Sequence, residues 1–131
     1  METRTQYTMY VPTRTIFGSG SLNSLHEQAL PGKKALIVIS RGNSVKVHGY
    51  LDRTKNELHQ AGVATALFDQ IEQNPLKSTV MAGGRAAREQ GCDFIVALGG
   101  GSCIDAGKAI AIMATNPGDY WDYIVSGTGG G

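Results

Sequence analysis

Three consecutive glycines, Gly99, Gly100 and Gly101, stand between an apolar stretch that ends at Leu98 and a helix-forming stretch that begins at Ser102. Because glycine has no Cβ, the backbone of such a turn can approach a ligand closely. The helix that follows directs unpaired N–H groups and the positive end of its dipole towards the turn. This chemistry suits an anion, so we predict that Gly99 to Ser102 bind the phosphate or pyrophosphate group of a nucleotide.

Two further polar side chains, Asp105 and Lys108, follow Ser102 at three-residue spacing and therefore share its helix face. Ser102 and Asp105 can also be explained as a variant capping box, and Lys108 as a solvated partner of Asp105. The adjacent glycines favour ligand contact for Ser102. For Asp105 the two interpretations weigh equally, and we keep it as a candidate cofactor-binding residue.

Two well-known phosphate-binding motifs do not fit this turn. A P-loop requires G-x-x-x-x-G-K-[ST], but Ser102 takes the place of its first glycine and Ala109 the place of its Ser or Thr. The dinucleotide motif G-x-G-x-x-G fails because Ile104 stands at its last glycine. A nucleotide would therefore be held in a different way.

Composition narrows the class of protein. With 131 residues, 41% of them hydrophobic, the chain suits one domain with its own core. A net charge of +1 argues against general binding to nucleic acid or to membrane surfaces. The first residues contain no apolar run, so we expect no signal peptide, and no stretch of ~20 apolar residues occurs. Cys92 and Cys103 do not suggest a disulfide framework. We expect a cytoplasmic protein with no membrane span.

Apolar runs alternate with helix-forming stretches, which predicts an α/β fold with a Rossmann-like parallel sheet flanked by helices. The run Ala35–Ile39 is rich in β-branched residues, as in a strand buried on both faces. Gly49 interrupts the helix-forming stretch 44–61, so two shorter helices can form there. The other expected strands are 63–68 and 94–98, the second of them also buried, and the expected helical stretches are 44–61, 78–90 and 102–114.

The N-terminal part precedes this alternation. Apolar residues alternate with polar ones at Tyr7, Met9 and Val11, which predicts a short strand, and Thr15–Phe17 predicts a second. Together they would make a short N-terminal β segment. Ser21 is a candidate cap for the short helix that follows.

The three histidines, His26, His48 and His59, lack the spacing of a metal motif, so we expect no metal ligand among them. The chain ends in the glycine-rich segment Ser126–Gly131, without a closing strand or helix. We therefore expect that it is truncated or is one piece of a larger protein.

The stretch Ala97–Ala111 resembles the G-G-G-S-x-x-D-x-x-K signature of the iron-containing alcohol dehydrogenases, also known as group III metal-dependent enzymes. Further similarity lies at Pro12–Thr13, Phe17–Gly20, Asn74–Pro75 and Asp119–Tyr123. The resemblance covers nearly the whole chain. It implies that residues 1–131 are a single N-terminal NAD(P)-binding domain, followed in the family by a helical C-terminal domain.

The same resemblance implies an oxidoreductase. In the family, the C-terminal domain binds iron or zinc through one Asp and three His, and hydride passes between a small alcohol or aldehyde and the nicotinamide. By this likeness Gly99–Ser102 would hold the pyrophosphate, Asp105 would lie near the ribose or nicotinamide, and Asn74 would line the cofactor cleft. No catalytic residue is expected in this chain, which alone would be inactive. A homodimer is a further family expectation.

The choice between NAD and NADP depends on the turn after the first strand. NAD-preferring family members carry an Asp there, whereas residues 40–46 contain no carboxylate. Arg41, Ser44 and the backbone of Gly42 can bind a 2′-phosphate, as the similar turn does in NADP-dependent butanol dehydrogenase-like members. We favour NADP. The alternative is that Ser44 only caps a helix and Arg41 only faces water.

Two other functions remain open at this point. One is a related fold with different chemistry, such as a dehydroquinate synthase-like lyase or a metal-free reductase. The other is a stand-alone, non-catalytic nucleotide-binding module.

Overall fold

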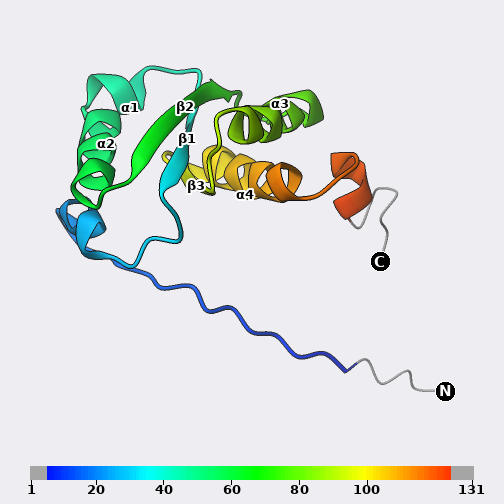
Figure 1. Ribbon diagram of the computed structural model, residues 1–131, viewed down its shortest axis with the longest axis horizontal. Coiled ribbons are helices and arrows are strands. Elements are labelled where there is room, and N and C mark those ends of the chain that lie inside the picture. Colours follow the sequence, from blue (N-terminus) through cyan, green and yellow to red (C-terminus); the bar gives the residue numbers. More distant parts are fainter. Residues whose placement is uncertain (1–5, 125–131) are drawn as a thin grey trace.

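Three parallel strands form the sheet of the computed structural model, which describes residues 6–124 (Figure 1). They are β1 (Lys34–Ser40), β2 (Ala64–Ile71) and β3 (Phe94–Ala97), in the order β2-β1-β3. Lys34 pairs with Ala64 on one side of β1, and Ala35 pairs with Phe94 on the other. The prediction of a parallel α/β fold is confirmed.

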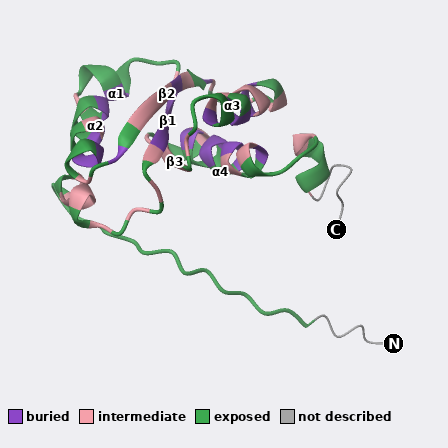
Figure 2. Ribbon diagram, in the orientation of Figure 1, coloured by how far each residue is buried: buried purple, intermediate pink, exposed green. Residues whose placement is uncertain are grey.

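The central strand β1 contributes residues to both hydrophobic cores, and Figure 2 colours most of this strand as buried. Leu36 and Val38 belong to one core cluster, whereas Ala35, Ile37 and Ile39 belong to the other. Successive side chains of a strand point to opposite faces, so a strand covered on both faces must be apolar throughout. All five residues are fully buried, which confirms the expectation for this run.

One face of the sheet is covered by the short helix α1 (Ser44–Val47) and by α2 (Tyr50–Gln60). Between them Gly49 has φ +76°, a left-handed conformation that ends one helix before the next begins. Leu51 and Leu58 of α2 are buried against β1. The alternative of two shorter helices is therefore correct.

The other face is covered by α3 (Lys77–Glu89) and α4 (Gly101–Thr115), which pack closely on each other. A Cβ added at Gly83 would lie 2.5 Å from Ile110 Cδ1, and one at Gly84 would lie 3.0 Å from Met113 Cβ. The glycine pair costs helix propensity, ~1 kcal/mol for each relative to alanine. The missing side chains allow α3 and α4 to pack more closely than larger residues at these two positions would permit.

Strand β3 differs from its prediction in length and burial. It ends at Ala97 rather than Leu98, and its four residues are half-buried instead of buried. Within residues 6–124 it pairs with β1 on one side only, so it stands at the edge of the sheet. Its apolar sequence indicates a strand correctly but cannot reveal how many neighbours that strand has.

The predicted N-terminal β segment is wrong. Residues 6–17 form no strand, and in Figure 1 they run as an extended chain away from the body of the molecule. Tyr10 is 84% exposed and Phe17 is 98% exposed. Alternation of apolar and polar residues gives only the propensity for a strand, and hydrogen bonds to a second strand must complete it. No described strand lies beside this segment.

A short 3₁₀ helix, η1 (Ser21–Glu27), follows. Gly20, with φ +75°, is its N-cap, and no side chain caps it, so the assignment of Ser21 as a cap is wrong.

A second 3₁₀ helix, η2 (Tyr120–Tyr123), closes the described part. The segment 126–131 lies outside the described residues. No helix within residues 6–124 is long and apolar enough to cross a membrane.

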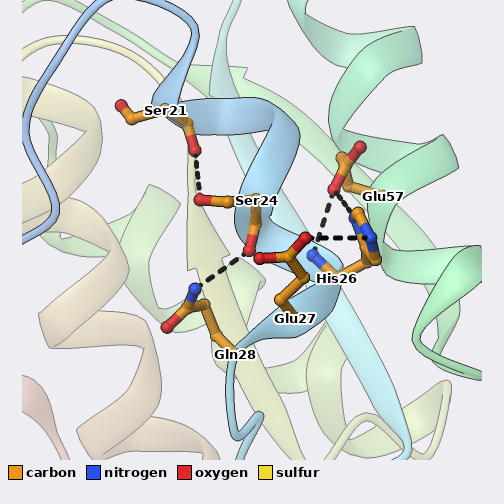
Figure 3. A network of polar contacts seen from close by, with 6 residues as sticks. All are labelled: Ser21, Ser24, His26, Glu27, Gln28 and Glu57. Carbon is orange, nitrogen blue, oxygen red and sulfur yellow. Dashed lines mark hydrogen bonds and ion pairs between the residues drawn. The ribbon is translucent and has the colours of Figure 1, made fainter.

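An ion pair ties η1 to α2, as Figure 3 shows. His26 Nδ1 lies 2.6 Å from Glu57 Oε2, and the backbone N–H of His26 donates to the same oxygen at 3.0 Å. The hydrogen bond to Glu57 raises the pKa of His26. The same bond lowers the pKa of Glu57. Glu27 adds a more distant contact, 3.8 Å from His26 Nε2.

We expect this pair to stabilise the fold most between pH 4.5 and 6.5, the ordinary pKa values of the two groups. Above this range the contribution is lost as pH rises through the raised pKa of His26, and below it as pH falls through the lowered pKa of Glu57. Thermal unfolding at about pH 5.5 and about pH 9 measures the difference. His26→Gln should reduce it, whereas His59→Gln, on the exposed side of α2, should not. Equal effects of the two substitutions would contradict the assignment.

Candidate functional site

The predicted site residues gather at one edge of the sheet. The carboxyl ends of parallel strands meet at a common edge, and the loops after β1, β2 and β3 all leave from it. The chain after β1 passes to the face of α1 and α2, whereas the chain after β3 passes to the face of α4. Loops that diverge from neighbouring strands in this way leave a crevice, the usual ligand site in open α/β sheets. The residues placed there are Arg41, Gly42 and Ser44 after β1, Asn74 after β2, and Gly99 to Ser102 after β3.

The glycine turn has different requirements at each position. Gly99 has φ +146°, and a Cβ there would lie 2.9 Å from Cys103 Sγ, so glycine is needed for the fold itself. At Gly100 and Gly101 an added Cβ meets no atom within 4 Å. These two glycines therefore border open space, where a side chain would occupy the room of a ligand. The residues present fit a dinucleotide's phosphates.

The first turn of α4 has no side-chain cap. Gly100 is its N-cap, and its carbonyl accepts from the N–H groups of Cys103 and Ile104, both at 3.1 Å. The Ser102 hydroxyl instead donates to the carbonyl of Gln73 at 2.5 Å. The alternative of a capping box between Ser102 and Asp105 is therefore wrong. The amide end of α4 remains directed at the crevice.

Asp105 lies one turn further along α4 and is exposed. Lys108 is exposed as well, and across the described ranges no ion pair joins it to Asp105. Asp105 borders a pocket of about 370 Å³ whose walls are mainly apolar. The pocket is lined by Pro75, Leu76, Lys77, Val80, Asp105, Ala106, Ala109, Tyr120, Trp121 and Ile124.

The loop after β1 presents an exposed guanidinium. The backbone N–H of Arg41 donates to the carbonyl of Ile71 at 3.0 Å, which holds this loop to the end of β2. Gly42 and Ser44 are exposed, and Asn43 rather than Ser44 is the N-cap of α1, without a side-chain hydrogen bond. The interpretation of Ser44 as a mere helix cap is therefore wrong.

The loop after β2 contains a residue that sequence reasoning missed. Glu72 Oε1 accepts from the backbone N–H of Leu76 at 3.0 Å and from the Thr79 hydroxyl at 2.5 Å. These two hydrogen bonds, with a smaller effect of Arg41, lower the pKa of Glu72. Asn74 lies exposed in the same loop, next to the residue that accepts from Ser102. Because β2 continues to Ile71, three residues past its predicted end, Glu72 stands at the strand terminus and not within a long loop.

No cluster of metal ligands lies at this edge within residues 6–124. That part of the chain contains no group of three or more His, Cys, Asp or Glu residues able to hold a metal ion. His26 is engaged by Glu57, and His48 lies near the ring of Tyr50. These residues do not fit a metal, and no chemical step here is assigned to one.

Known proteins resemble the chain over most of its length. A "Probable NADH-dependent butanol dehydrogenase 1" of Bacillus subtilis is 39% identical over 118 residues, which cover 90% of this chain and 30% of the relative. An "NADPH-dependent butanol dehydrogenase" of Clostridium saccharobutylicum is 38% identical over 114 residues, covering 87% of this chain and 29% of the relative. The chain thus spans about 30% of the length of these relatives.

A solved structure agrees with these matches. The crystal structure of NADH-dependent butanol dehydrogenase A from Thermotoga maritima superposes with a TM-score of 0.80 at 28% identity, covering 89% of this chain and 30% of the other. The family model described as "Iron-containing alcohol dehydrogenase" matches residues 12–130. These findings favour the dehydrogenase interpretation over the lyase and over the stand-alone module. The chain belongs to the iron-containing alcohol dehydrogenase family.

Proposed function

We propose that this chain is the nicotinamide-dinucleotide-binding part of an alcohol dehydrogenase that interconverts a small alcohol and its aldehyde. The observation that carries the proposal is the open backbone cradle at Gly100 and Gly101, at the amide end of α4 and at the carboxyl edge of the sheet. When bound, the nicotinamide ring supplies the acceptor or donor for hydride. No cluster of three or more metal ligands lies within residues 6–124, and we assign a catalytic metal to another part of the whole protein.

The residues of this chain would bind and orient the cofactor. The first amides of α4, together with the glycine turn and Ser102, would take the pyrophosphate. Asn74 is exposed in the loop after β2, and Asp105 is exposed on α4 beside the apolar pocket. We assign them to the ribose and nicotinamide side of the cofactor. The apolar pocket would exclude water from that side.

For the cofactor we propose NADP rather than NAD. The named relatives include both NADH-dependent and NADPH-dependent enzymes, so the choice depends on this chain's own turn. Residues 40–46 contain no carboxylate, and the Arg41 side chain is 68% exposed at the cofactor edge. A guanidinium can bind a phosphate through two parallel hydrogen bonds, with Gly42 and Ser44 as further donors.

Arg41→Asp should weaken NADPH binding by about tenfold or more and change NADH binding much less. The loss of a charge-assisted hydrogen bond to the 2′-phosphate is of this size. Calorimetric titration of the 131-residue chain with each cofactor measures the ratio. Arg85→Asp makes the same charge change at an exposed position of α3 and should leave the ratio unaltered. Equal affinities for both cofactors, unaffected by Arg41→Asp, would overturn the NADP assignment.

A further inference from the structure

Glu72 has one carboxylate oxygen that its own loop does not use. The side chain is 22% exposed, and Oε1 is fixed by Leu76 and Thr79 against the first turn of α3. The other oxygen, Oε2, is buried and has no hydrogen-bond partner within residues 6–124. A buried acceptor that lacks a partner is costly, so its surroundings usually provide one.

The cation that faces Oε2 is Arg41, whose Nε lies 4.0 Å away. This distance is too long for a direct hydrogen bond but is within the range of an ion pair between partly exposed side chains. The backbones of the two residues are already tied, because the Arg41 N–H donates to Ile71, the residue before Glu72. This contact fixes the backbone of Arg41, but it does not fix the orientation of the Arg41 guanidinium.

The direction of approach matters for that orientation. Glu72 meets Arg41 from its Nε side. A guanidinium has five N–H donors in a rigid plane, and its two terminal nitrogens then remain available on the other edge. Since the Arg41 side chain is largely exposed, that edge can take a phosphate in the bidentate geometry.

We propose that Glu72 is a positioning residue for the cofactor: its free oxygen holds the Nε side of Arg41, so that the terminal nitrogens face the 2′-phosphate of NADP(H). This inference rests on the proposed NADP site. The carboxylate also repels the phosphate, but that repulsion acts across the whole guanidinium and through water, whereas the attraction to Arg41 acts at close range. Orientation should therefore outweigh repulsion.

The test compares two probes on the full chain: adenosine 2′,5′-bisphosphate, which carries a 2′-phosphate, and adenosine 5′-monophosphate, which does not. Glu72→Gln keeps the shape and the Oε1 acceptor but removes the charge. It should weaken binding of the bisphosphate by about two- to fivefold, the range for a partly exposed ion pair, and leave the monophosphate unchanged. Asp69→Asn is the matched control, because Asp69 lies on β2, three residues before Glu72, and pairs with Lys46 instead.

A double-substitution cycle identifies the partner. In an Arg41→Ala background, Glu72→Gln should have no further effect on the bisphosphate. An effect that persists there, equal weakening of both probes, or tighter binding of the bisphosphate would each overturn the positioning role. If Arg41→Ala alone leaves the ratio of the two affinities unchanged, the NADP proposal itself fails. If neither probe binds the unsubstituted chain, the nucleotide site at the glycine turn fails with it.

Discussion

Ile110→Ala should lower the free energy of unfolding by about 2–5 kcal/mol. Ile110 is fully buried on α4, and its side chain fills the space that the missing Cβ of Gly83 leaves on α3. The two helices pack on each other along their length, so the surrounding backbone cannot close the resulting cavity. Equilibrium unfolding in urea, followed by circular dichroism, measures the loss.

The matched control is Ile112→Ala, two residues along the same helix at a side chain that is 38% exposed. It removes the same atoms and changes helix propensity equally, yet should cost much less. A second check uses Gly83→Ala, whose methyl group would enter the cavity. The double variant Gly83→Ala/Ile110→Ala should therefore be more stable than the sum of the single effects. If Ile110→Ala costs no more than Ile112→Ala, the close packing described for this helix pair is wrong.

Gly101→Leu should lower the affinity for the nucleotide by about 100-fold, close to the loss of two hydrogen bonds to charged groups. An added Cβ at Gly101 meets no protein atom within 4 Å, so the leucine side chain would extend into the space proposed for the phosphates. Gly101 is also the first residue of α4, where leucine is a better helix former than glycine. The thermal midpoint should therefore stay the same or rise while binding is lost.

Gly99→Ala is the contrasting variant. Its positive φ and its contact with Cys103 mean that a methyl group there strains the turn itself, so stability should fall. Calorimetric titration and thermal unfolding of both variants separate the two roles. Unchanged nucleotide affinity in a folded Gly101→Leu chain would show that the phosphates do not bind at this turn.

The centre of the fold could be predicted from the local sequence. The run Ala35–Ile39 predicts a strand covered on both faces, and the structure buries all five residues. Gly49 predicts a break in a helical stretch, and its left-handed φ makes that break. The glycines at 99–101 predict a strand-to-helix turn, which the structure forms at the open edge. In each case the local residue types are enough: apolar side chains suit burial on both faces of a sheet, and glycine permits backbone conformations that other residues avoid.

Features that depend on residues far apart in the sequence were predicted less accurately. The alternation at Tyr7, Met9 and Val11 has the period of a strand, but no described strand completes it. Strand β3 has the composition of an interior strand and lies at an edge. Glu72 gave no signal at all, because its importance comes from Arg41, Leu76 and Thr79, which the fold brings to it. A local sequence pattern cannot predict which strands will be neighbours in the sheet.

The hydrogen bond from the Ser102 hydroxyl to the Gln73 carbonyl crosses the carboxyl edge of the sheet, past the central strand β1. It fastens the loop of one outer strand to the helix that follows the other outer strand. A displacement of either loop is thereby transmitted to the other. Because the acceptor is a main-chain carbonyl, removal of the hydroxyl at position 102 would release this connection whatever side chain stands at position 73.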